Sequence, residues 1–545
     1  MARNEKKRKV HLEIQQSRKN PVGLLRTTYY DNGKIMHDNY GRITGIGLDK
    51  LKLIQAALQG KVVLKSEFEV VGCKEYGATR GMMEIARQTG LDRMIYSRPS
   101  EQWARDALAM IVGRAVYAGS KLALTRVASD STLWEQAGHN EEEIDVNTHC
   151  YAVMDRLLAR QQVIQKALAK QHLTGNCIVL YDITSSYLEG DYEKSELVDF
   201  GYNRDKKKGK KQIVIGLICA KNGCPIAVEV FRGNTGDAKT VADKILTVKK
   251  EYGANDAVFV GDRGMLTQCN LDNIATNDDL SIRTITALTR GGIANLCSEP
   301  NVQISMFDKD RVVEVTLPDA PGIRYGLCSN PFRAERARKT RSALISKTQA
   351  LLEKAAIPKR KTSDGVLGIR IGKILNKYKT GKYFNTEIKD GKLLFSVNQT
   401  GIDEEALYDG LYVIRTDVTP EHMTIEEAVE QYKGLAQVEQ AFRNLKSPQL
   451  EIRPIHHKTD ERINCHVFLC MLSYYLLWHM KQRLQPLFTE GGVGRSKKHT
   501  VFSVMERLKS IRKEKISFQG VTSFFITQPD YEQLMILNLL GISLS

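Results

Sequence analysis

The fold expected for this chain depends most on residues 176–190, NCIVLYDITSSYLEG. This stretch is rich in β-branched side chains and therefore predicts a β-strand. KQIVIGLICA (211–220) and PIAVEVFRG (225–233) predict two further strands, which a tight Lys-Asn-Gly turn connects. Three strands that follow one another in this way indicate an antiparallel meander.

A helix, a strand, a second helix and a fifth strand are predicted after the meander. GNTGD (233–237) is typical of a helix N-cap, and the helix that it begins extends to residue 251. NDAVFVGDRGM (255–265) predicts the fourth strand, and SIRTITALT (281–289) predicts the fifth after a helix at 266–279. This order is that of the ribonuclease H-like core, an α/β fold in which the first and fourth strands lie side by side and parallel.

Two aspartates stand at corresponding places in these strands. Asp182 lies near the end of the first strand, and Asp262 lies at the end of the fourth. The fold would bring both carboxylates to the same edge of the sheet, where they repel each other unless a cation lies between them. Mg²⁺ and Mn²⁺ prefer oxygen ligands, so Asp182 and Asp262 are candidate metal ligands. Either aspartate alone is more often an ordinary strand-end residue.

A third carboxylate is predicted on a later helix, YKGLAQVEQAFRNLKS (432–447). At helical spacing, one face carries Tyr432, Glu439, Arg443 and Lys446. An apolar stripe lies beside it and consists of Leu435, Val438, Ala441, Phe442 and Leu445. Glu439 either completes the metal site or forms a surface ion pair with Arg443, which follows it at the favoured i, i+4 spacing.

Composition indicates a folded protein with a polyanionic partner. The chain has 545 residues, a formal net charge of +17 and a pI of about 9.2. Such a balance favours nucleic acid as the partner. The 10 cysteines are scattered without a C-x-x-C pair, which argues against a disulfide scaffold or a zinc module and fits a reducing cytoplasm. The apolar run 463–480 is short for a membrane span and predicts a buried helix.

The chain resembles the DDE transposases of bacterial insertion sequences, in the broad insertion-sequence-four superfamily. That group carries the signature Y-x-x-R-x-x-x-E-x-x-x-x-x-x-K, which Tyr432, Glu439 and Lys446 match in register. Leu435 occupies the arginine position, so Arg443 is the candidate for that residue's phosphate contact. The blocks LYDITSSYLEG, VFRGNTGDAKT, VFVGDRGML and IRPIHHKTDERINCHVFLCMLSYYLL also look like those of the family. The resemblance covers residues 175–480.

The resemblance implies a metal-dependent enzyme that cuts and rejoins DNA. Asp182, Asp262 and Glu439 would be catalytic and would hold Mg²⁺ or Mn²⁺, expected as two ions. Tyr432 and Lys446 would contact DNA phosphates near the cleaved bond. Arg443 would make the phosphate contact of the signature arginine. The family also has a largely β insertion before its catalytic glutamate, which accounts for the long spacing between Asp262 and Glu439.

Two basic stretches are candidate DNA-binding surfaces. Residues 333–382 contain 15 Lys or Arg against three acidic residues, and Arg336, Arg338 and Lys339 are the candidates there. RDKKKGKK (204–211) contributes Lys206, Lys207 and Lys208. The alternatives are a solvated helical face for the first stretch and a soluble turn for the second.

The expected fold class is α/β: a ribonuclease H-like core interrupted by a mainly β insertion domain and preceded by a β-hairpin and a helical region. Residues 22–45 predict the hairpin, and the pattern from 77 to 172 is helical. The domain boundaries expected are 1–60 (basic arm and hairpin), 61–172 (helical, DNA-binding), 173–290 (core, first part), 291–424 (insertion), 425–480 (core, second part) and 481–545 (C-terminal, helical).

Three functions are consistent with the residues. The leading hypothesis is a DNA transposase that binds the inverted repeats of its own element and a target DNA, as a homodimer on DNA, in the bacterial cytoplasm and nucleoid. The second is a structure-specific nuclease on the same fold, which the multidomain size disfavours. The third is a DNA-binding protein that has lost catalysis, which the presence of Asp182, Asp262 and Glu439 disfavours.

Overall fold

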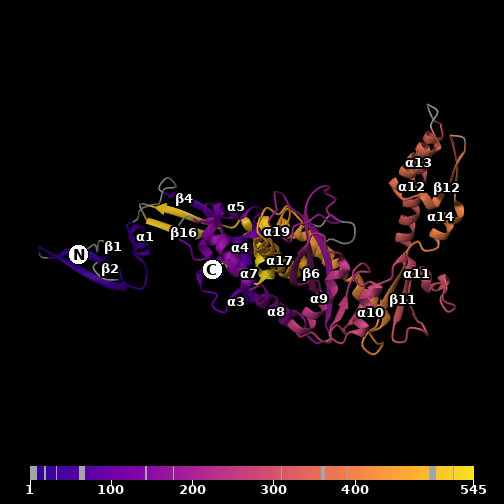
Figure 1. The fold of residues 1–545 in the computed structure, drawn as a ribbon. Helices are drawn as coiled ribbons and strands as arrows, with labels where there is room; N and C mark the ends of the chain where they lie inside the picture. The colour runs from indigo at the N-terminus through magenta and orange to yellow at the C-terminus, as the bar shows by residue number, and fades with distance from the viewer. Residues whose placement is uncertain are drawn as a thin grey trace. The chain divides into compact units, whose positions relative to one another are not determined.

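The structure of the protein is a computed structural model that describes most of the chain in two compact units. The described residues are 9–16, 20–31, 33–59, 68–140, 144–175, 177–308, 310–357, 363–389, 391–489, 499–518 and 521–544. Unit 1 comprises Met1–Arg160, Pro448–Glu451 and Leu472–Ser545, and unit 2 comprises Gln161–Ser447 and Ile452–Met471. Figure 1 labels the elements of both units.

The core of unit 2 is an eight-stranded sheet with the order β10-β11-β14-β9-β8-β5-β6-β7 (Figure 1). Its strands are β5 (Ile178–Tyr187), β6 (Gln212–Ala220), β7 (Pro225–Arg232), β8 (Val258–Val260), β9 (Arg283–Ala287), β10 (Val313–Thr316), β11 (Arg324–Ser329) and β14 (Leu411–Thr416). β5 is antiparallel to β6 and parallel to β8, and β8 is parallel to β9. The predicted parallel pairing of the first and fourth strands is therefore confirmed.

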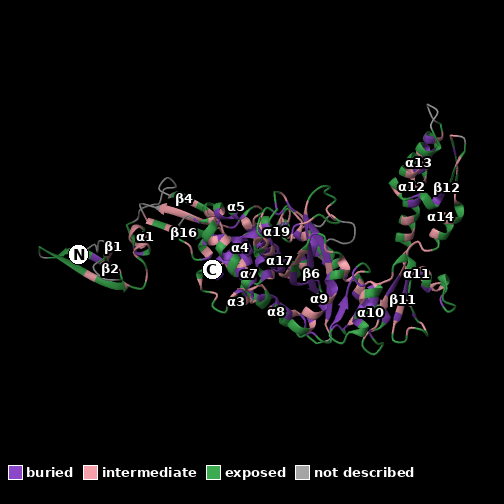
Figure 2. Ribbon diagram, viewed as in Figure 1, coloured by how far each residue is buried: buried purple, intermediate pink, exposed green. Residues whose placement is uncertain are grey.

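Burial explains why these stretches form central strands. All nine residues of β6 and eight of the ten in β5 are buried, and Figure 2 shows β6 in the colour of buried residues. Strands with both faces covered read as continuous apolar runs. The helices that pack on the sheet are α8 (Gln161–His172) against β7, α16 (Leu435–Leu445) against β5 and β6, and α15 (Ile425–Lys433) against β9, β11 and β14.

The helices between these strands follow the sequence-based order. A 3₁₀ turn at Asp237–Thr240 leads into α9 (Val241–Leu246), and α10 (Gln268–Thr276) lies between β8 and β9. The fourth strand is shorter than predicted, because β8 contains only three residues of the 255–265 stretch. Asp262 therefore lies in the turn beyond β8 rather than in the strand.

A helical module projects from the sheet between β11 and β14. It consists of α12 (Pro331–Ala356), α13 (Asp364–Tyr378), α14 (Gln399–Ala406) and the hairpin β12 (Phe384–Lys389) and β13 (Lys392–Val397). Its own core includes Leu352, Leu367, Ile371 and Phe384. The prediction of a mainly β insertion over 291–424 is wrong, because α12 and α13 span 26 and 15 residues and the strands β10, β11 and β14 extend the central sheet instead.

We expect Leu352→Ala to destabilise this module. Leu352 is fully buried in the module core, and truncating a buried leucine costs about 2–5 kcal/mol of unfolding free energy. Ile357→Ala is the matched control, because Ile357 is 78% exposed just beyond α12. Urea unfolding followed by circular dichroism measures both variants, and an equal loss in the two would contradict the packing described.

Unit 1 combines segments from both ends of the chain. Its elements are β1 (Val10–Gln15), β2 (Val22–Asp31), β3 (Lys34–Ile43), α1 (Leu48–Leu58), β4 (Phe68–Glu75), α2 (Gly77–Gln88), α3 (Leu91–Ile95), α4 (Gln102–Val116), α5 (Lys121–Arg126), α6 (Leu133–Gln136), α7 (Ala152–Ala159), α18 (Gln485–Thr489), α19 (Val501–Lys509), β15 (Arg512–Phe518), β16 (Val521–Ile526) and α20 (Tyr531–Leu540). The predicted hairpin is β2 and β3, and β2 also pairs with β1, which gives a three-stranded sheet. The predicted helical segment from 77 to 172 is confirmed.

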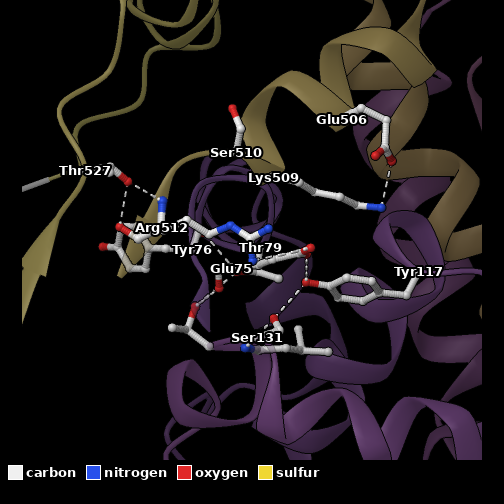
Figure 3. Close-up of polar contacts among 12 residues, drawn as sticks. Glu75, Tyr76, Thr79, Tyr117, Ser131, Glu506, Lys509, Ser510, Arg512 and Thr527 are labelled. Carbon is white, nitrogen blue, oxygen red and sulfur yellow. Dashed lines mark hydrogen bonds and ion pairs between the residues drawn. The ribbon is translucent and has the colours of Figure 1, made fainter. Parts of the chain in front are cut away.

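A second sheet of unit 1, with the order β16-β15-β4, joins the two ends of the chain. Its connection to the helices is polar (Figure 3): the Tyr117 hydroxyl lies 2.9 Å from Glu75 Oε2 and 2.7 Å from Ser131 Oγ, and the Arg512 guanidinium lies 3.9 Å from Glu75 Oε1. Burial raises the pKa of Tyr117 above its usual range. The prediction of a helical region over 481–545 is confirmed for α18, α19 and α20 but is wrong for β15 and β16, which form part of this sheet.

The predicted buried helix at 463–480 is confirmed as part of α17 (Asp460–Arg483). Its apolar side chains, including Phe468, Met471 and Tyr475, are buried. No single described helix is long and apolar enough to cross a membrane, and only the pair Gln102–Val116 and Lys121–Ser129, bent by 99°, meets both conditions when joined.

Candidate active site

Asp182 and Asp262 occupy equivalent places on two parallel strands. In the register of β5 and β8, Leu180 lies opposite Val260. Asp182 and Asp262 each follow two residues later, so both side chains lie just past the end of β8. Asp182 is in the middle of β5 rather than near its end, because β5 continues beyond its short neighbour.

A turn after β8 fixes the Asp262 carboxylate. Its Oδ1 accepts hydrogen bonds from the backbone N–H groups of Gly264 and Met265, each at 2.9 Å. A Cβ at Gly264 would lie in ordinary contact with both Asp262 Oδ1, at 3.4 Å, and Asp237 Oδ2, at 3.8 Å. The turn therefore fixes Asp262 with Asp237 near the same place.

Glu439 is presented by α16, whose apolar stripe packs as predicted. Leu435, Val438, Ala441, Phe442 and Leu445 are all buried. The helix expected over 432–447 is interrupted at Gly434, so Tyr432 belongs to α15 and Lys446 caps α16. A side chain at Gly434 would meet the Gln431 carbonyl oxygen at 2.8 Å, which explains the glycine at this tight junction. Tyr432 still lies close enough to Asp262 and Glu439 for their charges to act on it.

One open pocket with a volume of about 590 Å³ gathers the predicted carboxylates. Its lining residues are Asp182, Ile183, Thr184, Tyr202, Arg204, Asp237, Asp262, Glu439, Phe442, Arg443, Lys446 and Arg453. Glu439 is 65% exposed and lies 3.8 Å from Arg443, so the surface ion pair also exists. Both readings of Glu439 from the sequence are thus compatible with its position, and the pocket adds the neighbouring aspartates.

The charges in this pocket act strongly on Asp182. Burial, together with the nearby negative charges of Asp262 and Glu439, raises the pKa of Asp182 from 3.8 to about 7, although Arg204 and a hydrogen bond from the Ile183 N–H oppose the shift. Burial and the same two carboxylates also raise the pKa of Tyr432. Carboxylates held this close without a cation between them favour the protonated form. The donor set consists of oxygens and fits Mg²⁺ or Mn²⁺.

We expect Mn²⁺ affinity to rise with pH until Asp182 is ionised. A metal ion bound by Asp182 would have to displace the proton from this carboxyl group, so affinity should increase about tenfold per pH unit below 7 and level off above it. Calorimetric titration with Mn²⁺ from pH 5 to 8 measures this affinity, and a flat affinity profile would contradict the prediction.

The same raised pKa predicts that the metal-free protein loses stability from about pH 4 to 7, because the folded state retains a proton that the unfolded chain releases.

Several pocket residues were not predicted from the sequence. Arg204 Nη2 lies 2.6 Å from Asp237 Oδ2, which places an ion pair beside the carboxylates. Arg453 lies 2.9 Å from Asp205 Oδ1. The GNTGD and RDKKKGKK stretches contain Asp237, Arg204 and Asp205, but they were interpreted for capping and for their lysines. No local pattern marks these residues, because contacts between distant segments bring them together.

The predicted DNA-binding residues fall in three places. Arg443 and Lys446 line the pocket. Lys206, Lys207 and Lys208 are exposed in the loop that leads to β6, and they do not line the pocket. Arg336, Arg338 and Lys339 are exposed on α12, in the helical module.

Comparison with known proteins identifies the family. The family model described as the transposase DDE domain matches residues 130–476, a span that contains Asp182, Asp262 and Glu439. A search of curated proteins found no match. Members of this family transfer phosphoryl groups on nucleic acid and generally use divalent metal ions. The match covers more than half of the 545 residues, and the chain therefore belongs to the transposase DDE domain family.

Proposed function

We propose that this transposase cuts DNA at the ends of its own mobile element and joins those ends to a target DNA. The observation that carries the proposal is the pocket on which Asp182, Asp262 and Glu439 converge. We also propose that β5 to β9 form a ribonuclease H-like core and that the helical module is an insertion into it. The parallel β5–β8 pair and the antiparallel β5-β6-β7 meander support that assignment.

In this proposal Asp182, Asp262 and Glu439 are the metal ligands. Two divalent ions bound there would activate water or a 3′-hydroxyl group and stabilise the departing oxygen. The protein contributes position: the turn after β8 fixes Asp262, the burial of β5 fixes Asp182, and the apolar face of α16 fixes Glu439. Fixed groups of this kind supply most of the catalysis in phosphoryl transfer.

The cationic side chains around the carboxylates would bind phosphates of the DNA backbone. Arg443 is 69% exposed at the pocket, and Arg204 and Arg453 line it as well. The exposed cations Lys206, Lys207, Lys208, Arg336, Arg338 and Lys339 would contact phosphates of double-stranded DNA further along its path. Tyr432, half-buried beside the carboxylates, would contact a phosphate near the cleaved bond. Pairing of two element ends would require a homodimer on DNA.

A strand-transfer assay tests this function against its alternatives. Duplexes carrying the inverted repeats that flank the gene are incubated with the protein, Mn²⁺ and a supercoiled target plasmid. We expect cleavage at the repeat ends and covalent joining of their 3′ ends to the plasmid. Cleavage without joining would favour a structure-specific nuclease, and tight binding without cleavage would favour a protein that has lost catalysis.

A further inference from the structure

The Lys446 amine uses every hydrogen-bond donor that it has within the protein. Its Nζ donates to Thr184 Oγ1 at 2.8 Å, to the Ser185 carbonyl oxygen at 2.7 Å and to Asp205 Oδ1 at 2.9 Å. A lysine ammonium carries three N–H groups and no more. The side chain is 13% exposed. No donor is therefore left for a DNA phosphate unless one of these bonds breaks.

The three acceptors connect the structural elements that carry the carboxylates. Thr184 and Ser185 follow Asp182 on β5, so Lys446 binds the strand just beyond the first aspartate. Lys446 itself caps α16, the helix that presents Glu439. α16 also packs on β5 through its apolar stripe, but apolar contacts alone are non-directional. The hydrogen bonds of the amine are directional, and they therefore fix the position of the C-terminal end of α16 along β5.

Asp205 would be left in an unfavourable state if Lys446 moved to a phosphate. Its side chain is 3% exposed, and its Oδ1 also lies 2.9 Å from Arg453 Nη1. Its Oδ2 is buried and has no hydrogen-bond partner among the residues that the structure describes. If Lys446 moved away, Arg453 would be the remaining ion-pair partner of this buried carboxylate among the described residues, and a buried charge that loses part of its compensation is destabilised. Asp205 therefore favours the position that Lys446 occupies.

We propose that Lys446 is a positioning residue, which holds Glu439 over Asp182, and that the phosphate contact on this helix is made by Arg443. This inference rests on the proposed metal site. Arg443 lies on the same helix, lines the same pocket and is 69% exposed. Its only ion pair among the described residues is the 3.8 Å contact with Glu439, which a metal ion at Glu439 would weaken. The two cations therefore have separate roles.

The test compares Lys446→Met with Arg443→Gln in two binding measurements. Mn²⁺ affinity is measured without DNA by electron paramagnetic resonance, and DNA affinity is measured without metal as a function of salt. We expect Lys446→Met to bind Mn²⁺ about 10- to 100-fold more weakly, as for other residues that orient metal ligands, with an unchanged salt slope. Arg443→Gln should bind Mn²⁺ normally and lose about one unit of the slope of log affinity against log salt.

The reverse pattern, a smaller salt slope and normal Mn²⁺ affinity in Lys446→Met, would overturn the inference and leave the proposed function standing. Wild-type protein that binds neither Mn²⁺ nor DNA would overturn both. If Lys446→Met does not fold, Asp205→Asn provides a second test of the same proposal. A positioning role predicts weaker Mn²⁺ binding in Asp205→Asn, whereas a phosphate role predicts tighter DNA binding with Mn²⁺ affinity intact, because Lys446 would be released. Thermal unfolding of each variant identifies losses that come from misfolding.

Discussion

We expect Glu439→Gln to lower the rate of DNA cleavage by more than about 100-fold. Residues that only orient metal ligands already change activity by about 10- to 100-fold, so the loss of a ligand should exceed that range. Glutamine keeps the size of the side chain and removes its charge. DNA affinity should stay within about twofold, since phosphate contacts come from cations and not from this carboxylate. Single-turnover cleavage of a repeat-end duplex in Mn²⁺ measures the rate.

Glu430→Gln is the matched control for this substitution. Glu430 is an exposed glutamate on the neighbouring helix α15, and it does not line the pocket. Asp182→Asn and Asp262→Asn should match Glu439→Gln, because all three carboxylates line one pocket. Equal activity in Glu439→Gln and Glu430→Gln would reduce Glu439 to the surface partner of Arg443.

The second large effect expected is a steep dependence of DNA affinity on salt. A protein that contacts 6–10 phosphates loses about 10³–10⁵ in affinity between 50 and 200 mM salt. Replacing Arg336, Arg338 and Lys339 together by glutamine should reduce the slope of log affinity against log salt by about three units. All three side chains are exposed on α12, although Lys339 also pairs with Glu335 at 2.6 Å. Fluorescence anisotropy over a salt series measures the slope.

A charge-matched control separates contact from net charge. Lys170, Lys221 and Lys250 are exposed in the same unit, and their replacement by glutamine removes the same formal charge. The control should keep the wild-type slope. If both triple variants change the slope equally, α12 does not lie along the DNA, and the basic face of the module is only solvated.

The catalytic core could be predicted because its signals are local. β6 is a nearly continuous apolar run and is buried along its whole length, as expected for a strand covered on both faces, and β5 and the first half of β7 are rich in β-branched and apolar residues. Glu439 was found through helical spacing, since the apolar stripe of α16 fixes the face on which it lies. The place of Asp182 and Asp262 followed from strand order, because parallel neighbours end at one edge of the sheet.

Other features depend on contacts between residues distant in sequence. β4 and β15 pair although more than 400 positions separate them, and neither strand has a strong apolar pattern of its own. The residues between 333 and 382 predict a basic helical stretch, which α12 and α13 confirm, but the family expectation of a mainly β insertion is wrong for 291–424 as a whole. The bonds of Lys446 were also hidden, since Thr184 and Asp205 come from other segments.

We propose above that Asp182, Asp262 and Glu439 bind the same metal ions. Fe²⁺ substituted for Mg²⁺, with ascorbate and peroxide, releases hydroxyl radicals that cut the nearest backbone and so map the ion's ligands. We predict cuts close to residues 182, 262 and 439 in one sample, all lost in Asp262→Asn. Cuts at only one of these positions, or cuts that persist unchanged in Asp262→Asn, would contradict the account.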